Sequence, residues 1–460
     1  MGNSNPSRPS TSFVVKSDTF MEKTVEHALQ GVNPGGIYQA TWCRDASYIL
    51  RDWTLSGNMI AALQHLYLIW SHQISPGREK LVYGRGSPEM DFLPEQAKDE
   101  KQKEFAGALP TTIYQAGFSE VYGKNPDIDS TALMVSTTSW ILDKALKSKS
   151  PSSSTTKTSE SSTMASQHSS NYVYGLMSKL GITEPTKAMD FLIPRMLLAV
   201  DSLSNRDIDD DGLLEQSHNE DWMDTVLRAG KIVYSQACWI LALRNLSKLL
   251  LDVQKEKESN KLERMAQNAI RAVERKLWSE EDQAYIDVQE THHIGGPYRT
   301  LTQDVSLYVV AVSENSKRDK LSGGQQNYSK QKTDKEDIHR ANRTLDTIRR
   351  RAWKRKWPLV TEVELKSTGP WHLKPYEYHN HTFWPWATGI EMLARSRLDR
   401  LKECNLLLST LMSESNNLQM HTFYEWINPI TGQGNGAFPF RTGISAVRIS
   451  IADILKSIKT

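Results

Sequence analysis

Two short segments of this chain combine carboxylates with large aromatic rings. One reads Asp-Trp-Met-Asp at 221–224, and the other reads Phe-Tyr-Glu-Trp at 423–426. A carboxyl group packed against an apolar ring has its charged form disfavoured, so its pKa rises and it can stay protonated as an acid. Glycoside hydrolysis needs two carboxyl groups, one that protonates the leaving oxygen and one that activates water or attacks the sugar. Because sugar rings stack on aromatic walls, this pair of segments indicates a carbohydrate site.

Two further segments could contribute to such a site. Arg44 stands beside Asp45 in Thr-Trp-Cys-Arg-Asp at 41–45, which places donors next to an acceptor and suits two neighbouring sugar hydroxyls. A salt bridge at the start of a helix is the structural alternative. His379 and His381 lie in an aromatic segment and have no third ligand close in sequence. We therefore interpret that segment as a pocket wall and predict no metal site there.

One acidic turn resembles the start of a calcium loop. It reads Asp-Ile-Asp-Asp-Asp-Gly at 207–212, but the twelfth loop position is His218 instead of the bidentate Glu, which excludes a complete EF-hand. A calcium site completed by Glu215 or Glu220 remains open, beside the alternative of a turn solvated by its own carboxylates. The candidate calcium ligands are Asp207, Asp209 and Asp211.

The charge balance of the chain argues against polyanionic partners. Fifty-six basic and 54 acidic residues leave a formal charge of +2, so no global field attracts nucleic acid or a membrane surface. The run of basic and aromatic residues at 349–357 is interpreted as a solvated helix end. No window is long and apolar enough to cross a bilayer, and we see no apolar signal core. Three widely spaced cysteines, Cys43, Cys238 and Cys404, predict a reduced, cytoplasmic protein.

The apolar pattern predicts a mainly helical chain, and the site segments lie at or next to the ends of the expected helices. Strand-like runs are short, as at 359–365. About twelve helices would fit a ring of six helical hairpins, although a count alone does not separate that ring from other helical arrays. Apolar residues at three- and four-residue spacing predict helices over 44–55, 59–74, 128–146, 186–203, 233–251, 262–277, 302–312, 384–397, 401–411 and 442–458.

Polar segments divide this helical pattern. We expect a flexible N-terminus over 1–17 and polar surface insertions at about 147–170 and 314–337. Because the acidic-aromatic segments lie on both sides of each insertion, we predict a single domain over 18–460.

Taken together, these segments make the chain resemble the six-hairpin glycosidases. It looks most similar to the amylo-α-1,6-glucosidase domain of glycogen debranching enzymes, and it also resembles glucoamylases and the family-63 α-glucosidases with their mannosylglycerate-hydrolase relatives. Five motifs follow the order of that family and extend over about residues 20 to 458. They read Trp-Cys-Arg-Asp at 42–45, Asp-Ile-Asp-Ser-Thr at 127–131, Trp-Met-Asp at 222–224, Tyr-His-Asn-His-Thr-Phe-Trp-Pro-Trp at 378–386, and Glu-Trp-Ile-Asn-Pro-Ile-Thr-Gly at 425–432.

The resemblance implies an all-α (α/α)6 toroid with short strands in its loops, an inverting mechanism, an α-linked sugar substrate and no required cofactor. It implies that Asp224 is the general acid and Glu425 the general base, and that Arg44 and Asp45 hold the sugar before the scissile bond. We expect the remaining substrate-binding side chains to be Trp42, Asp129, Trp222, His379, Asn380, Trp384, Trp386, Tyr424 and Trp426.

Three departures from the family pattern argue against glycogen itself as the substrate. His381 stands where the family has Gly, the segment that begins at Glu425 is of the family-63 type, and we see no large N-terminal debranching domain. We predict hydrolysis of a terminal α-linked glucosyl or related residue from an oligosaccharide or small glycoside. The alternatives are a compatible-solute hydrolase acting on mannosylglycerate, glucosylglycerate or trehalose, a phosphorylase, and a non-catalytic carbohydrate-binding protein.

Overall fold

The computed structural model describes residues 11–75, 82–83, 103–148, 185–290, 296–321, 328–367, 372–417 and 420–459. Ten of its helices match the ten ranges expected from the apolar spacing, most with ends that differ by a few residues, and two more were not expected. The twelve α-helices of these described ranges are α1 Thr11–Ala28, α2 Cys43–Leu55, α3 Met59–Ser71, α6 Ile128–Ser148, α8 Pro185–Ser204, α9 Val233–Asp252, α10 Glu256–Lys276, α11 Ser306–Leu321, α12 Tyr328–Arg351, α13 Pro385–Arg397, α14 Leu401–Asn417 and α15 Arg441–Lys459.

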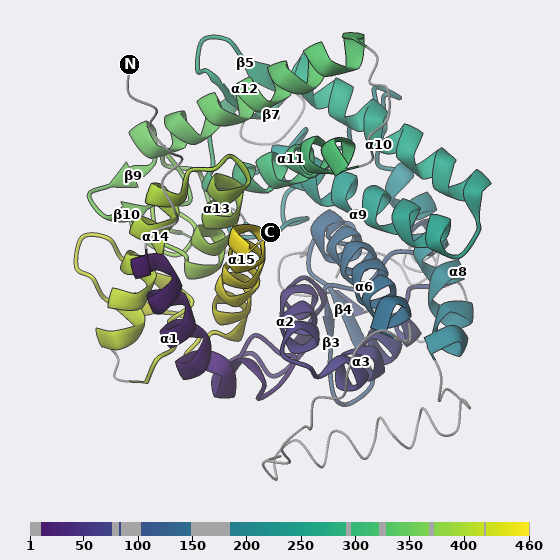
Figure 1. Cartoon of the computed structure of the whole chain (residues 1–460), viewed down its shortest axis with the longest axis horizontal. Coiled ribbons are helices and arrows are strands. Elements are labelled where there is room, and N and C mark those ends of the chain that lie inside the picture. The colour runs from purple at the N-terminus through teal and green to yellow at the C-terminus, as the bar shows by residue number, and fades with distance from the viewer. Residues whose placement is uncertain are drawn as a thin grey trace.

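The helices alternate along the chain between an outer and an inner ring. The inner helices α2, α6, α9, α11, α13 and α15 each contact the next, and α15 closes the ring against α2 (Figure 1). The outer helices α1, α3, α8, α10, α12 and α14 pack against the inner ones. This arrangement confirms the predicted all-α toroid of six helical hairpins.

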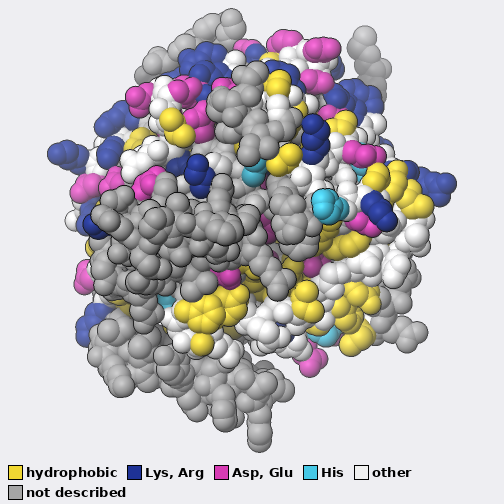
Figure 2. Space-filling model, turned by 180° about the vertical axis from the view of Figure 1, so that it is seen from behind, with side chains coloured by type: hydrophobic (Ala, Val, Ile, Leu, Met, Phe, Trp, Pro, Cys, Tyr) yellow, Lys and Arg dark blue, Asp and Glu magenta, His cyan; other side chains and the backbone are white. Residues whose placement is uncertain are grey.

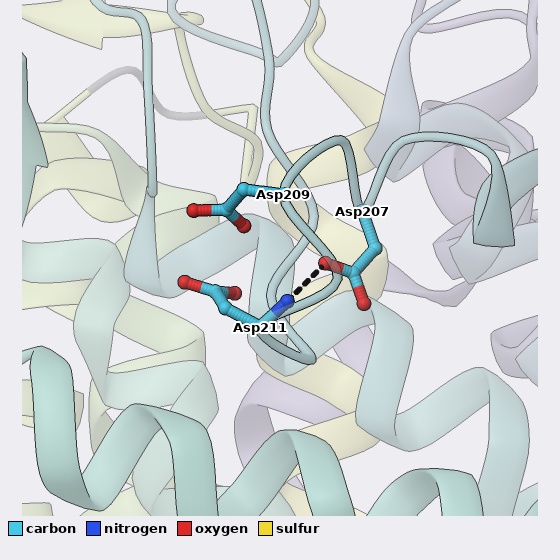
Figure 3. A group of neighbouring side chains, drawn as sticks. All are labelled: Asp207, Asp209 and Asp211. Atoms are coloured by element: carbon cyan, nitrogen blue, oxygen red, sulfur yellow. Dashed lines mark hydrogen bonds between the residues drawn. The ribbon is translucent and has the colours of Figure 1, made fainter.

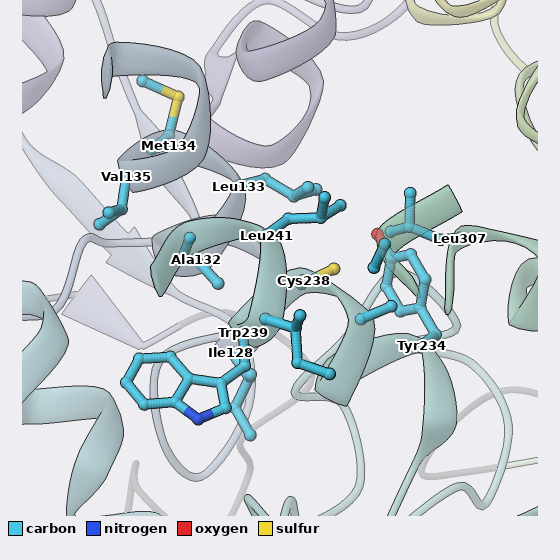
Figure 4. Close-up of a cluster of buried hydrophobic side chains, with 14 of the residues drawn as sticks. Ile128, Ala132, Leu133, Met134, Val135, Tyr234, Cys238, Trp239, Leu241 and Leu307 are labelled. Carbon is cyan, nitrogen blue, oxygen red and sulfur yellow. The ribbon is translucent and has the colours of Figure 1, made fainter. Parts of the chain in front are cut away.

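The inner ring is held together by apolar side chains that two or more helices share. Side chains of α6, such as Ile128 and Leu133, meet Cys238 and Leu241 of α9 and Leu307 of α11 (Figure 4). All of these are buried. Because α6 and α9 are buried on nearly every side, their sequences are apolar or carry small hydroxyl residues almost all the way round.

Short strands and one 3-10 helix occupy the loops, as predicted. The largest sheet has the order β1-β3-β4-β2 and carries Trp42 opposite Thr112. The other strands form two-stranded hairpins. The bounds are β1 Thr41–Trp42, β2 Val82–Tyr83, β3 Thr112–Ile113, β4 Ser119–Val121, β5 Trp278–Ser279, β6 Ala284–Tyr285, β7 Asp287–Gln289, β8 Tyr298–Thr300, η1 Gln303–Val305, β9 Trp353–Lys354, β10 Trp357–Pro358, β11 Trp426–Ile427 and β12 Gly434–Asn435.

Helix α1 corrects the expected boundary of the N-terminus. Residues 11–17 are helical, although we expected them to be flexible. The buried stripe of α1 includes Ser17 and Thr24 beside Phe13 and Phe20, so hydroxyl side chains interrupt the apolar periodicity that the prediction relied on. Thr24 Oγ1 donates to the Phe20 carbonyl at 2.7 Å, which satisfies that hydroxyl inside the helix.

Two other expectations fall within the described residues, and a third falls mostly outside them. The expected insertion at 314–337 is helical at 314–321 and 328–337, within α11 and α12. Helix α12 escaped prediction because, among its residues 336–351, whose side chains the structure describes, the buried apolar residues are Ala341, Leu345 and Ile348. The expected strand at 359–365 forms only an isolated bridge at Thr361. The insertion expected at 147–170 lies outside the described residues beyond Ser148.

The described helices and the charges on one face of the molecule bear on the prediction of no membrane or polyanionic partner. Within the described ranges, every helix falls short of the length and apolar content that a bilayer crossing demands. On the face seen in Figure 2, acidic and basic side chains intermingle. Half of the cations of the basic run at 349–357 pair with carboxylates: Arg349 pairs with Glu403, Arg351 with Asp282, and Lys356 with Glu414. These pairings fit the interpretation of the run as an ordinary helix end.

Candidate active site

The pocket of interest is built from residues just before, or within the first turns of, the inner helices. Arg44 and Tyr48 lie on one face of α2 at i, i+4 spacing, and Trp386 and Thr442 lie in the first turns of α13 and α15. Asp224 comes from the loop before α9. The toroid therefore brings residues from across the chain to one end of its inner ring.

Most of the predicted substrate and catalytic residues lie around this pocket. Asp224 and Glu425, about two hundred residues apart in sequence, both line it. The predicted residues that line it with them are Trp42, Arg44, Asp45, Trp222, His379, Trp384 and Trp386.

Four predicted substrate-binding residues do not belong to the described lining. Asp129 lies behind Arg44 and is fully buried, and Asn380 accepts a hydrogen bond from the Leu365 N–H at 3.2 Å. The Tyr424 ring packs against Phe438 at 4.6 Å, and Trp426 packs on the apolar core. These side chains lie behind or beside the pocket wall.

Sequence reasoning did not assign several residues that the pocket contains. Tyr378 stood inside a quoted motif without being given a role, and Tyr48 follows Arg44 by one helical turn. That one-turn spacing was the only signal available for Tyr48. The lining residues without an assignment are Pro34, Tyr38, Tyr48, Tyr378, Phe440 and Thr442.

Asp224 has the environment of a carboxylic acid that keeps its proton near neutral pH. Burial, together with the negative charges of Glu425, Asp221 and Asp129, raises the pKa of Asp224 to about 7 against the lowering effect of Arg44. The carboxyl is still 21% exposed, because it faces the pocket. A carboxyl with this pKa can donate a proton to a bound ligand at neutral pH.

Glu425 is also buried but is surrounded by hydrogen-bond donors. Its Oε1 accepts from the Tyr38 hydroxyl at 2.7 Å and from the Tyr378 hydroxyl at 3.0 Å, and its Oε2 accepts from the Ala437 N–H at 2.9 Å. Burial raises the pKa of Glu425 above its usual value, and these three donors oppose part of that rise. They stabilise the ionised form, so Glu425 is prepared as a carboxylate where Asp224 is prepared as an acid.

Gly436 allows the backbone to approach the Glu425 carboxylate. Its φ is +75°, and a Cβ at this position would overlap Glu425 Oε2. A side chain there is excluded both by the left-handed backbone conformation and by this contact.

Aromatic rings form the wall beside Asp224. The Trp222 ring meets those of Trp384 and Trp386 edge to face, with centroids 5.3 and 4.7 Å apart. His379 stacks on Trp384 at 5.0 Å, and its Nδ1 lies 2.8 Å from the Thr225 hydroxyl. Burial holds the pKa of His379 well below its usual range, so this imidazole is neutral. The wall therefore presents apolar ring faces and the uncharged imidazole of His379.

Arg44 is held by carboxylates from two inner helices. Its Nη1 lies 3.3 Å from Asp129 and 3.7 Å from Asp127 at the start of α6, and its Nε lies 3.8 Å from Asp45. Asp45 in turn accepts a hydrogen bond from the Thr442 hydroxyl at 2.6 Å. The pair at the start of α2 is therefore both a salt bridge and part of the pocket lining, so the two interpretations of this pair do not exclude one another.

The acidic turn of the calcium hypothesis lies away from this pocket. Asp207, Asp209 and Asp211 bring carboxylate oxygens within 4.8 Å of one another (Figure 3). Lys231 Nζ lies 2.7 Å from both Asp209 and Asp211, and Asp207 Oδ1 accepts the Asp211 N–H at 2.9 Å. Glu220 pairs with Arg206 instead. The Lys231 ammonium thus already pairs with two of the three carboxylates that would have to bind a calcium ion.

No family model matches the chain, and no curated protein matches it. Solved structures do resemble it at low sequence identity. A GH63 mannosylglycerate hydrolase from Thermus thermophilus, in complex with glucose, is 15% identical with a TM-score of 0.57, over 95% of this chain and 99% of that one.

Two other solved structures share the architecture. A glucoamylase from Saccharomycopsis fibuligera is 11% identical with a TM-score of 0.57, over 100% of this chain and 99% of that one. A rhamnosidase from Klebsiella oxytoca with rhamnose bound is 12% identical with a TM-score of 0.55, over 99% of this chain and 66% of that one. At these identities the likenesses support the (α/α)6 fold.

Proposed function

We propose that this protein is an inverting glycoside hydrolase that releases a terminal α-linked glucosyl or related residue. The observation that carries the proposal is the pair of carboxyl groups in one pocket, with Asp224 prepared as an acid and Glu425 as a base. This hydrolysis needs one carboxyl that stays protonated and a second whose ionised form is stabilised. The aromatic wall beside Asp224 supports a sugar as the ligand.

In this mechanism Asp224 gives its proton to the glycosidic oxygen as the bond to the anomeric carbon breaks. Glu425 takes a proton from a water molecule, whose oxygen attacks that carbon from the opposite face of the sugar ring. Three hydrogen-bond donors on Glu425 hold its two oxygens in place and spread its charge, which favours a base that polarises water over a nucleophile. Arg44 and Asp45 would hold sugar hydroxyls at the closed end of the pocket.

The second candidate is hydrolysis of a compatible solute, such as mannosylglycerate, glucosylglycerate or trehalose, by the same pair of carboxyls. It is favoured by the fold likeness to a mannosylglycerate hydrolase along nearly the full length of both chains. Amylo-α-1,6-glucosidase activity is the first candidate within the glucosyl class. A cytoplasmic location is part of the proposal, because Cys43, Cys238 and Cys404 are all buried free thiols.

The test is to incubate the protein with maltose, isomaltose, trehalose, glucosylglycerate, mannosylglycerate and glycogen, and to follow the released anomer by proton NMR. Early β-anomer from an α-linked substrate is the expected result, with Asp224→Asn and Glu425→Gln as matched inactive variants. Early α-anomer would instead show retention. If the folded protein releases no sugar from any of these substrates, the hydrolase proposal fails and a phosphorylase or a binding protein takes its place.

A further inference from the structure

A buried charge cluster lies directly behind the loop that carries Asp224. Arg228 is fully buried, and its guanidinium lies 3.0 Å from Asp221, 2.9 Å from Asp287 and 2.9 Å from Asp304. The side chains of these three carboxylates are at most 1% exposed. One cation therefore pairs with three carboxylates in a part of the protein that bulk water does not reach.

The cluster holds the loop on the N-terminal side of Asp224. Asp221 Oδ1 accepts the Met223 N–H at 2.9 Å, which fixes the backbone just before the acid. The Trp222 indole N–H donates to Asp304 Oδ2 at 2.6 Å. The ring that forms the pocket wall and the backbone that carries the acid are thus anchored to the same charges.

The same cluster ties this loop to the inner helices. Asp287, in β7, accepts the Val233 N–H at the start of α9 at 2.9 Å through its Oδ1, while its Oδ2 accepts from Arg228. Asp304, in η1, stands immediately before α11 and also accepts from Arg228. Movement of the acid loop would therefore break contacts at the starts of two inner helices.

The cluster carries an excess of negative charge. Burial raises the pKa of Asp221 and of Asp287 to about 6 each, against the lowering effect of Arg228, so both are mostly ionised at neutral pH. With Arg228 contributing a single positive charge, the cluster is then net negative. If the cluster only stabilised the packing, equal numbers of positive and negative charges would stabilise it more, because each buried ion loses its hydration and needs a partner of opposite charge.

This negative charge acts on Asp224. Asp221 is one of three carboxylates that raise the pKa of Asp224, together with Glu425 and Asp129, while Arg44 lowers it. Three further titratable groups near the acid, among the described residues, are uncharged near neutral pH. Those groups are the imidazole of His379, with Nδ1 at 3.9 Å, and the phenols of Tyr38 and Tyr378, whose pKa values burial raises.

We propose that Arg228, Asp221, Asp287 and Asp304 are positioning residues that fix the loop of Asp224, and that Asp221 among them supplies negative charge that keeps the acid protonated. This inference rests on the proposed function, because it concerns how the acid of that site is prepared. Its consequence is that the alkaline limit of activity depends on a group that does not touch the substrate.

The decisive variant is Asp221→Asn. The amide keeps an oxygen for the Met223 N–H but removes the charge, so the alkaline limb of the kcat pH profile should move to lower pH. The expected shift is on the order of one pH unit, the effect of one nearby charge through a protein interior. On the acid side of the optimum, kcat should stay within a few-fold of the wild-type value.

Asp52→Asn is the matched control. Asp52 is also buried, pairs with an arginine, Arg448, at 2.8 Å, and has a pKa raised to about 6 by burial, but it is not among the charges that act on Asp224. The Asp52→Asn variant should have a lower melting temperature than the wild type, but the alkaline limb of its kcat pH profile should not move. If Asp221→Asn behaves in the same way as Asp52→Asn, the cluster is only structural and the proposal is overturned.

A second readout does not depend on turnover. A carbodiimide couples an amine to protonated carboxyl groups, and mass spectrometry of the peptide that contains Asp224 gives the pH midpoint of labelling. We expect Asp221→Asn to lower that midpoint and Asp52→Asn to leave it unchanged. If the wild type hydrolyses none of the substrates, the proposed function fails, while this midpoint still decides whether the cluster sets the protonation of Asp224.

Should Asp221→Asn not fold, Asp221→Ser removes the same charge with a smaller side chain whose hydroxyl can still accept from the Met223 N–H. Its labelling midpoint and its alkaline limb should move in the same direction. An unchanged midpoint in a folded Asp221→Ser variant would contradict the proposal.

Discussion

Replacing Tyr38 by Phe should raise the pKa of Glu425, the proposed catalytic base. The Tyr38 hydroxyl donates to Glu425 Oε1 at 2.7 Å, and the phenol is neutral because burial holds its own pKa well above the usual value. A hydrogen bond to an ionised group contributes about 1.5–3 kcal/mol. One pKa unit corresponds to about 1.4 kcal/mol, so losing the full bond would raise the pKa of Glu425 by about 1–2 units.

The second phenol reduces this effect. Tyr378 donates to the same oxygen at 3.0 Å and lies 3.2 Å from the Tyr38 hydroxyl, so it can take up part of the lost interaction. We therefore expect a shift of about one unit for Tyr38→Phe and a larger one for the double variant with Tyr378→Phe. The sign is fixed, because both phenols stabilise the ionised carboxylate.

The assay is the pH profile of kcat/KM, whose acid limb reports the pKa of the base in the free enzyme. The limb should move to higher pH, so activity is lost first at low pH. Tyr424→Phe is the control, since Tyr424 precedes Glu425 in sequence but packs against Phe438 outside the described pocket lining. An acid limb that stays within about 0.2 pH units in the double variant would refute the assignment of Glu425 as the base, given the energies expected for such bonds.

Three further outcomes are expected. Asp224→Asn should lower kcat by about 10²–10⁴-fold, the range for loss of general acid catalysis, and calorimetry should show a melting temperature no lower than that of the wild type, because the variant no longer buries a carboxyl. Gly436→Ala should lower kcat at least about ten-fold, because the added Cβ would overlap Glu425 Oε2. Gly432→Ala is the control. Gly432 has a similar φ of +73° and so the same backbone strain, but an added Cβ there meets no atom within 4 Å, and this variant should keep its activity. Burial raises the pKa of Asp221 from 3.8 to about 6. Between these pH values the native state still holds the Asp221 proton, whereas the unfolded state has lost it. The contribution of Asp221 to wild-type stability therefore falls as pH rises from about 3.8 to about 6. Denaturant unfolding at pH 4 and pH 7 should then show Asp221→Asn gaining on the wild type by up to about 3 kcal/mol, and a pH-independent difference would show that Asp221 does not titrate in this way.

Helix prediction succeeded where burial is one-sided or complete and the apolar spacing is unbroken. It failed for α1, where Ser17 and Thr24 lie within the buried stripe, and for α12, whose apolar face is short. In both cases the packing of the toroid stabilises a helix whose own pattern is weak, which a local reading of sequence does not include.

For the candidate site, the sequence indicated residues that stand in motifs. Trp42, Arg44 and Asp45 occur together in one short motif, and so their likeness to a sugar site was visible. Tyr38 and Thr442 are isolated in sequence and reach the pocket only because the loop before α2 and the start of α15 close the ring. A single residue without a repeated spacing carries no local signal of its role.

The sequence by itself determined the helical character of the chain, the six-hairpin resemblance and the two acidic-aromatic segments, because these depend on residue type and short-range spacing. Only the tertiary structure placed Asp224 and Glu425 around one pocket, put Asp129 behind Arg44, and gathered three carboxylates on Arg228. The opposite preparation of the two carboxyls was decided there as well. A pKa is set by burial and by neighbouring charges, and both come from segments far apart in the chain that meet only when the ring closes.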